Sequence, residues 1–543
     1  MMSVPEGRWT LALIWSAIHA TERLAACLDF WEMQNRTTQR IGLYSKAMVK
    51  TPQGAEMDDL TSWSLRKMVD AFRAKNVSAR ELLEAHLSRF ETYHSVLNAI
   101  VVSDVEGARQ LADQADKAWA QGEDWGPLHG IPMTVKEAFD VKGMKTTIGL
   151  PWLRNNVASQ DAVLVRQLKQ AGANIWGKTN LPTSSYDWQT NNLVYGRTCN
   201  PWDPTCTPGG SSGGAAAAVA AGLTPVGIGS DVAGSIRVPS HFCGVYGLRP
   251  SFGLLSSKGH ANMPGGCHAM RHFVSVGPHA RHVEDIDFLM REVLLDPRRD
   301  TSQFAMGLGK QRPLSTLKIA YTMDIGYPLS LDTKDVCLQV VETLRKAGAE
   351  VIEASPSYSF EEAFQCWGDV HGFELKQLAP WIGRGWMGGL LMRFAILRWM
   401  FGASTYAKYV GRGTTNNRFR YFLAQHTLDG ILEQLDSFFD TYDLWLMPVA
   451  GRTAFPHCRT GASLEVDGQK VPYSDVTGVW NCVTSLTGHA ALAIPCGMGR
   501  DGLPIGLQLQ APRFHDLFLL HAAKELEALL TPVGMPALEK TMG

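Results

Sequence analysis

The sequence predicts an α/β fold built on a large, mostly parallel β-sheet that is covered by helices on both faces. Short apolar segments typical of buried strands alternate with segments of helical periodicity along most of the chain. At two places a predicted helix ends at a glycine and a strand follows at once. The length of 543 residues and the apolar share of 45% are sufficient for a large core.

Four segments show the apolar spacing of amphipathic helices. They are 65–72, 78–90, 161–171 and 336–346. Ser78 and Glu81 form a capping box at the start of the second helix, and Asp161 is expected to cap the third. Gly172 and Gly348 are expected to end the third and fourth helices.

Four short apolar segments are predicted to be buried strands. They are 174–176, 225–229, 316–321 and 351–352. A fifth apolar run, within 129–137, leads into Lys136 and is also expected to be a strand. Because these strands alternate with helices, we expect most of them to lie parallel in one sheet.

Residues from about 355 to 440 interrupt this alternation as a helical, aromatic-rich insertion. Its segment Leu390–Phe401 is apolar apart from two arginines, and is too short and too charged to span a bilayer. Three interpretations stay open for it: a buried helix or pocket wall, the subunit interface of a homodimer, or a monotopic membrane-binding patch. No integral membrane segment is predicted.

Residues 1–56 lack clear periodicity and are interpreted as an N-terminal extension that is either poorly ordered or the result of a mis-assigned start. Met48 or Met57 is the alternative start. The apolar run Thr10–Ala20 lacks the features of a signal peptide. The remainder, 57–535, is predicted to form a single domain that includes the insertion.

Composition excludes several classes of function. The 51 basic and 52 acidic residues give a formal net charge of −1, so the basic footprint of a nucleic-acid-binding protein is absent. The 16 Trp, 21 Phe and 13 Tyr residues exclude an intrinsically disordered chain. The ten cysteines contain no C-x-x-C pair or zinc-type spacing, which favours a reducing, cytoplasmic compartment.

Glycine is concentrated in one stretch of the chain. Ten glycines fall between Gly209 and Gly247, and only Asp231 and Arg237 are charged there. Glycine allows backbone conformations and close approaches that other residues do not. This stretch is therefore expected to contain positions at which a side chain would not fit.

Ser211 stands between two glycine pairs, just before a run of small residues typical of a helix. A phosphate loop would need a lysine that is absent here. A nucleophile elbow would need a preceding strand, whereas Asn200–Pro204 is typical of a loop. The remaining interpretations are a serine near backbone amides at a helix N-terminus and a flexible glycine-serine loop.

Ser235 and Lys136 are the other candidate catalytic residues. Ser235 follows a turn of small residues that could direct several backbone N–H groups at one point, although an ordinary turn fits the same pattern. Lys136 ends an apolar run, where burial would favour a neutral amine that acts as a base. The alternative for Lys136 is a lysine at a strand end with its amine in water.

Together these segments resemble the motifs of the amidase signature family, in the family's order along the chain. The segments that carry the resemblance are 129–137, 177–182, 207–215, 231–237, 242–250, 487–490, 494–495 and 501–508. The resemblance extends from about residue 58 to about residue 530 and is loose between 300 and 440. It implies a single α/β/α catalytic domain around a large mixed sheet.

The resemblance also implies a Ser-Ser-Lys triad. Ser235 is the implied nucleophile, Ser211 is the bridging serine on a cis peptide bond, and Lys136 is the base. The backbone N–H groups of Val232, Ala233, Gly234 and Ser235 are expected to form the oxyanion hole. Neither a cofactor nor a metal is expected in this mechanism.

The expected function is hydrolysis of a small-molecule amide through an acyl-enzyme, with esters, anilides or carbamates as related substrates, so that the chain is also a urethanase candidate. The tryptophans of the insertion suggest an apolar or aryl substrate. The alternative is the glutamine-hydrolysing subunit of a tRNA-dependent amidotransferase. Such subunits usually carry an Asp-Gln-Ile-Gly-Pro string where this chain has Ser275-Val276-Gly277-Pro278. A non-catalytic scaffold is a third, weaker interpretation.

The chain departs from the family pattern at three positions. Ala233 replaces a common glycine, so a positive φ there would be strained. Thr183 replaces a common acidic residue, and Glu137 replaces an aspartate. A separate group of histidines includes His268 and His272 at helical spacing, but no third metal ligand is recognisable.

Overall fold

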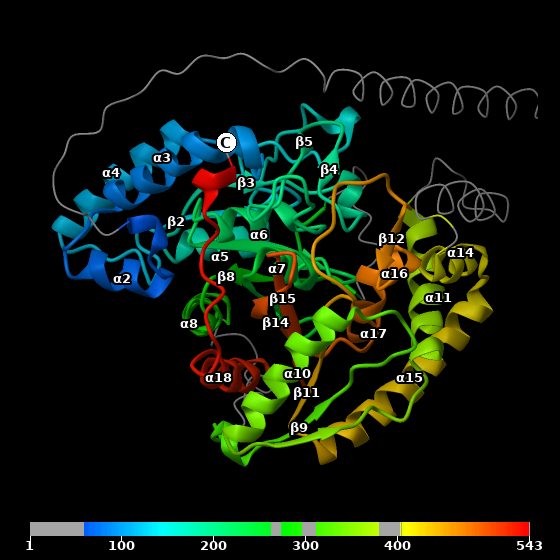
Figure 1. Ribbon diagram of the computed structural model, residues 1–543. Coiled ribbons are helices and arrows are strands. Elements are labelled where there is room, and N and C mark those ends of the chain that lie inside the picture. Colours follow the sequence, from blue (N-terminus) through cyan, green and yellow to red (C-terminus); the bar gives the residue numbers. More distant parts are fainter. Residues whose placement is uncertain (1–58, 262–272, 296–310, 379–401, 403, 542–543) are drawn as a thin grey trace, which may run out of the picture. The chain divides into compact units, whose positions relative to one another are not determined.

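The computed structural model describes residues 59–261, 273–295, 311–378, 402 and 404–541 (Figure 1). They belong to one compact unit that begins at Asp59. The N-terminal extension and the segment Leu390–Phe401 lie outside the described residues, so their interpretations stay predictions.

The described residues contain an eleven-stranded sheet. Its spatial order is β1 (Ile100–Ser103), β3 (Asn174–Thr179), β2 (Pro132–Lys136), β6 (Val226–Asp231), β8 (Ser275–Ala280), β7 (Tyr246–Arg249), β14 (Ala490–Met498), β15 (Pro504–Ala511), β11 (Leu444–Pro448), β9 (Lys318–Tyr321) and β10 (Glu350–Glu353). Strand β2 is parallel to β3 and β6, and β9 is parallel to β10 and β11. The strands from β6 through β15 to β11 pair antiparallel, as do β1 and β3.

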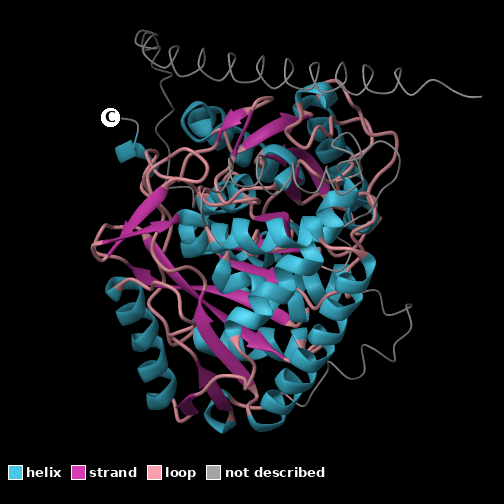
Figure 2. Cartoon of the chain, turned by 90° about the vertical axis from the view of Figure 1, so that its right-hand side faces the viewer, coloured by secondary structure: helices cyan, strands magenta, loops and turns pink. Residues whose placement is uncertain are grey.

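Helices lie on both sides of this sheet (Figure 2). The helices of the described residues are α2 (Leu65–Arg73), α3 (Ala79–Leu97), α4 (Val105–Ala120), α5 (Val163–Gln170), α6 (Gly213–Ala220), α7 (Arg237–Cys243), α8 (Val283–Leu289), α10 (Leu331–Lys346), α11 (Phe360–Leu378), α14 (Thr405–Thr415), α15 (Arg418–Thr441), α16 (Tyr473–Thr477), α17 (Val479–Thr487) and α18 (Asp516–Glu527). Two small hairpins pair β4 (Asn191–Asn192) with β5 (Gly196–Arg197), and β12 (Ser463–Val466) with β13 (Gln469–Pro472). The predicted α/β class, with a large mixed sheet between helices, is confirmed. The expected parallel pairing holds among the predicted strands, β2 with β3 and β6 and β9 with β10, whereas six of the ten neighbouring pairs of this sheet are antiparallel.

Local signals predicted most of the early helices correctly. The capping box at α3 is present: the Ser78 hydroxyl accepts from the Glu81 amide, and the Glu81 carboxylate accepts from the Ser78 amide. The predicted cap of α5 is wrong, because the helix begins after Ala162 without a side-chain cap. Asp161 lies one residue before the N-cap, and its carboxylate instead accepts from the Lys142 amide and the Lys169 ammonium, both at 2.8 Å.

The aromatic-rich insertion is helical where it is described, as α11, α14 and α15. Trp367 of α11 is fully buried, whereas Trp381, Trp386 and Trp399 lie outside the described residues. None of the helices in the described ranges is long and apolar enough to cross a membrane.

Candidate active site

Lys136 is the last residue of β2, and its side chain is fully buried. Strand β2 lies between β3 and β6, so neighbouring strands enclose it from both sides. The Lys136 Nζ atom lies 2.7 Å from Ser211 Oγ and 3.1 Å from Ser230 Oγ. The alternative of a lysine with its amine in water is therefore excluded.

Burial also changes the protonation of Lys136. Desolvation lowers the pKa of Lys136 to about 7, and the negative charge of Asp231 opposes that shift only in part. This shift makes the neutral amine of Lys136 available near neutral pH. A neutral amine can accept a proton from a hydroxyl group at hydrogen-bond distance.

Ser211 is held in a buried loop that ends at the N-terminus of α6; we call residues 207–212 the Ser211 loop. The Gly210–Ser211 peptide bond is cis, as the resemblance implied, and Ser211 is 2% exposed. A Cβ atom on Gly210 would lie 2.5 Å from the Asp187 carbonyl oxygen. This close approach requires glycine. The interpretation as a flexible glycine-serine loop is wrong because residues 207–212 are all buried.

Ser235 lies in the turn between β6 and α7; we call residues 232–236 the Ser235 loop. Its carbonyl oxygen accepts from the Ser212 amide at 3.0 Å, which joins the two serine loops through their backbones. The structure thus brings Lys136 and Ser211 into direct contact and places Ser235 beside them through the backbone. No hydrogen bond joins the Ser235 hydroxyl to another described residue, and Ser235 keeps 9% exposure.

Among the described residues, some backbone N–H groups of the Ser235 loop have a hydrogen-bond acceptor and others have none. The Gly234 amide donates to Asp231 Oδ1 at 2.7 Å, and the Ile236 amide donates to Asp231 Oδ2 at 3.1 Å. Within the described part of the chain, the amides of Val232, Ala233 and Ser235 have no such acceptor. The Gly234 amide, expected among the oxyanion donors, is therefore already used by Asp231 in this conformation.

The backbone at Ala233 does not have the strained, positive φ that the sequence raised as a possibility. The positive φ of this loop falls on Gly234, at +92°, and Ala233 is not among the residues with positive φ. A Cβ atom on Gly234 would lie 2.6 Å from Asn481 Cγ, so a glycine is needed there for two reasons. Alanine is tolerated one residue earlier.

A buried ion cluster fixes both ends of the Ser235 loop. Arg237 donates from Nε to Asp231 Oδ2 and from Nη2 to Asp231 Oδ1, both at 3.0 Å. Burial alone would raise the pKa of Asp231, but the charge and hydrogen bonds of Arg237, with Arg249 nearby, hold it below its ordinary value. The sequence showed Asp231 and Arg237 as the two charges of a glycine-rich stretch, and nothing in it marked them as partners.

Comparisons with known proteins agree with this geometry. A model of the Amidase family matches residues 81–520, which is most of the chain. The chain belongs to the amidase family. It is a hydrolase that acts on amides, and the predicted resemblance is confirmed.

Two curated relatives represent different activities within this family. An acylamidase of Rhodococcus erythropolis is 30% identical over 86% of this chain and 95% of its own length. A glutamyl-tRNA(Gln) amidotransferase subunit of Synechococcus sp. (strain WH7803) is 32% identical over 83% of this chain and 94% of its own length. Among solved structures, 6-aminohexanoate cyclic dimer hydrolase matches with a TM-score of 0.71 and 25% identity, over 89% of this chain and all of that one.

The amidase core carries an aromatic cluster next to the Ser235 loop. Ala233 of that loop belongs to the same apolar core as side chains of the insertion and of α17. We use the term aromatic cluster for seven aromatic residues of this core: Trp188, Phe273, Phe364, Trp367, Tyr406, Tyr409 and Trp480. Within it the Trp188 ring meets Tyr406 edge-on at a centroid distance of 4.9 Å.

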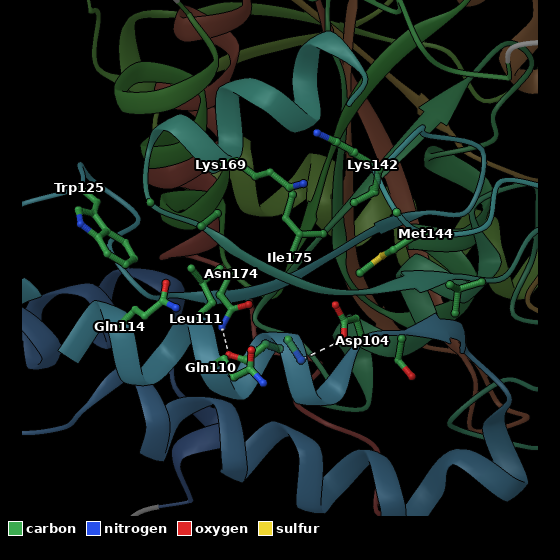
Figure 3. Close-up of a pocket in the computed structure, with 18 of the residues that line it drawn as sticks. Asp104, Gln110, Leu111, Gln114, Trp125, Lys142, Met144, Lys169, Asn174 and Ile175 are labelled. Carbon is green, nitrogen blue, oxygen red and sulfur yellow. Dashed lines mark hydrogen bonds between the residues drawn. The ribbon is translucent and has the colours of Figure 1, made fainter. Parts of the chain in front are cut away.

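A cavity of about 870 Å³ lies elsewhere in the amidase (Figure 3). It is bounded by residues of β1, β3 and α4 and by the turn 141–145, and Lys142 and Lys169 lie at one side of it. Neither Lys136 nor either candidate serine lines this cavity. We therefore assign this cavity no role in amide hydrolysis.

Several histidines lie between residues 260 and 282. His268 and His272 lie outside the described residues. His260 and His279 are buried, and desolvation, with the nearby charge of Lys136, lowers the pKa of each to about 3. Both are thus neutral at pH 7, and no group of metal-binding side chains occurs among the residues that the structure describes.

The other two departures from the family pattern, Glu137 and Thr183, differ in burial. Glu137 is buried and accepts from the Ile148 amide at 2.9 Å and from the Tyr195 hydroxyl at 3.1 Å. Thr183 is exposed in a short 3-10 turn. Neither side chain has a hydrogen bond with Lys136 or with the two serines.

Replacement of Asp231 by asparagine is expected to destabilise the protein by about 3 to 5 kcal/mol, because it leaves the buried Arg237 guanidinium without its counter-charge. Urea unfolding measures this difference. Asp70→Asn is the matched control, since Asp70 pairs with Arg66 on the surface and should cost under about 1 kcal/mol. Equal small losses in both variants would contradict a structural role for the Asp231–Arg237 pair.

Proposed function

We propose that this amidase cleaves its substrate through a Ser-Ser-Lys triad, with Ser235 as nucleophile, Ser211 as bridging serine and Lys136 as base. The observation that carries the proposal is the contact of 2.7 Å between Lys136 Nζ and Ser211 Oγ in a fully buried environment. The lowered pKa of Lys136, about 7, supports a base that is available at neutral pH.

The first half of the reaction forms an acyl-enzyme. Neutral Lys136 accepts the proton of the Ser211 hydroxyl while Ser211 accepts the proton of Ser235, and Ser235 Oγ attacks the amide carbonyl carbon. When the tetrahedral intermediate collapses, the proton returns from Lys136 through Ser211 to the amide nitrogen. The carbon–nitrogen bond breaks and the amine leaves.

The second half releases the acid. A water molecule attacks the acyl carbon and gives its proton through Ser211 to Lys136. The bond between the acyl carbon and Ser235 Oγ then breaks, and the proton returns to Ser235. The same groups thus act first as base and then as acid in each half.

We propose that the oxyanion is bound by the backbone N–H groups of Val232, Ala233 and Ser235. These amides have no acceptor in the described residues, whereas the Gly234 amide is bonded to Asp231. A donor of this kind contributes about 3 to 4 kcal/mol of transition-state stabilisation in comparable sites.

The proposed substrates are apolar or aryl amides, with anilides, esters and carbamates as related substrates of the same acyl-enzyme route. The acylamidase relative supports an amide of this kind. The eight cysteines of the described residues are all free thiols, which supports a reducing, cytoplasmic location.

Glutamine hydrolysis within an amidotransferase is the second candidate function. It is favoured by the 32% identity to the Synechococcus amidotransferase protein. Against it stands the Ser275-Val276-Gly277-Pro278 string. Ser275 begins β8 and pairs directly with Asp231, which precedes the Ser235 loop. The difference in sequence from the amidotransferase subunits therefore lies close to that loop.

A substrate panel separates the two functions. We expect the purified chain alone to release aniline products from acyl anilides and to hydrolyse alkyl and aryl amides, with little or no ammonia from glutamine. Turnover of glutamine only, and only with added partner subunits, would support the amidotransferase and contradict the proposed substrate class.

A further inference from the structure

Trp188 makes a contact with the Ser235 loop that the triad does not account for. It lies between the 3-10 turn Thr183–Ser185 and β4, and it is 4% exposed. Its indole Nε1–H donates to the carbonyl oxygen of Ala233 at 2.9 Å. Ala233 is two residues before Ser235, so this bond acts on the backbone that carries the proposed oxyanion donors.

The peptide group between Ala233 and Gly234 is held at both ends. Its carbonyl oxygen accepts from Trp188, and its N–H group donates to Asp231 Oδ1 at 2.7 Å. Because a trans peptide group is planar and its C=O and N–H point in opposite directions, two partners on opposite sides fix its rotation. The amides of Ala233 and Ser235 belong to the two neighbouring peptide groups, and their directions depend on this plane.

The position of Trp188 is itself well determined. A Cβ atom on Gly478 would lie 2.1 Å from Trp188 Cζ2, so the indole occupies space that only a glycine leaves open. The preceding residue, Asp187, accepts from the Tyr473 hydroxyl at 2.6 Å and from the Trp188 amide at 2.7 Å. Such a fixed donor can hold a backbone group in one orientation.

The same short segment also holds the Ser211 loop. The Thr190 hydroxyl donates to the Gly209 carbonyl at 2.9 Å, two residues before Ser211. Gly210 packs directly against the backbone of Asp187 and Trp188. Residues 187–190 therefore contact both serine loops, and Trp188 supplies the contact with the Ser235 loop.

We infer that Trp188 is a positioning residue for the oxyanion hole, which it orients by fixing the Ala233–Gly234 peptide group. This inference rests on the proposed function, because it assumes that the amides of Ala233 and Ser235 bind the oxyanion. Trp188 acts in the transition state through these amides. Loss of its N–H group should therefore lower kcat and leave KM nearly unchanged.

The test replaces Trp188 by phenylalanine, which removes the N–H group and keeps an aromatic ring. We expect kcat for an acyl anilide to fall by about tenfold or more, with KM within about twofold of the wild type. Hydrogen exchange of the peptide that covers residues 231–237 should become faster, since the Ala233–Gly234 group is then held at one end only.

Trp202→Phe is the matched control. The indole of Trp202 also donates to a backbone carbonyl at 2.9 Å, but to Cys243 at the C-terminal end of α7. We expect this variant to keep the wild-type kcat and the wild-type exchange over 231–237. An equal loss of kcat in both variants, or wild-type kcat and exchange in Trp188→Phe, would overturn the inference.

The exchange measurement separates this inference from the proposed function. If the wild type hydrolysed no amide, or if Ser235→Ala retained full turnover, the proposed triad would fail. The exchange over 231–237 would still show whether Trp188 orders the loop. Unchanged exchange with an active wild type would refute the role of Trp188 alone.

Discussion

Replacement of Ser235 by alanine is expected to lower kcat for an amide substrate by about 10⁴-fold or more, because the variant has no atom to attack the carbonyl carbon. Its stability should be close to that of the wild type, since the Ser235 hydroxyl has no hydrogen bond with another described residue. Release of aniline from an acyl anilide, followed by absorbance, measures the first effect, and thermal unfolding measures the second.

Ser240→Ala is the matched control for this variant. Ser240 is also buried and lies five residues further along the chain, and its hydroxyl bonds to His279 Nδ1 at 3.0 Å. It should keep kcat within about threefold of the wild type while losing some stability. A Ser235→Ala enzyme with more than about a tenth of the wild-type kcat would contradict the assignment of the nucleophile.

The pH profile of kcat/KM is expected to depend on Lys136. Only the neutral amine can accept a proton, and burial lowers the pKa of Lys136 to about 7. The rate should therefore rise about tenfold per pH unit below pH 7 and level off above it. Lys136→Met should lower kcat/KM by about 10²-fold to 10⁴-fold at pH 8 and remove this rise.

Lys178 provides a matched control for Lys136. It is a second fully buried lysine on the adjacent strand β3, and burial lowers its pKa to about 8. Its ammonium group donates to Thr146 Oγ1 at 2.8 Å and to the Lys145 carbonyl, and to neither candidate serine. Lys178→Met should leave the midpoint of the profile near pH 7. A midpoint that moved with Lys178 and persisted without Lys136 would refute Lys136 as the base.

The parts of the fold that depend on neighbouring residues were predictable from the sequence. The capping box of Ser78 and Glu81 and the glycine after α5 act within a few residues, and the structure contains both. The cap expected at Asp161 is wrong because the helix begins one residue later, while Asp161 binds the Lys142 amide, 19 residues away. Such a contact depends on the tertiary fold and leaves no local pattern.

For the candidate site, too, the sequence predicted the residues but not the contacts between distant parts of the chain. Lys136, Ser211 and Ser235 stand in recognisable motifs, but the burial of Lys136 depends on the strands at its sides. Trp188 was not singled out, because its contact with Ala233 joins residues 45 positions apart. The use of the Gly234 amide by Asp231 likewise follows from the conformation of the turn, which the sequence alone does not specify.

The formation of a covalent bond to Ser235 is the most direct test of the triad. A fluorophosphonate probe reacts with an activated serine by forming an oxygen–phosphorus bond and releasing fluoride. Mass spectrometry of the digested protein should then find the adduct on the peptide that contains Ser235. The rate of labelling should fall below pH 7, because Lys136 is protonated there. An adduct on a different serine, or labelling that persists unchanged in Ser235→Ala, would contradict the account.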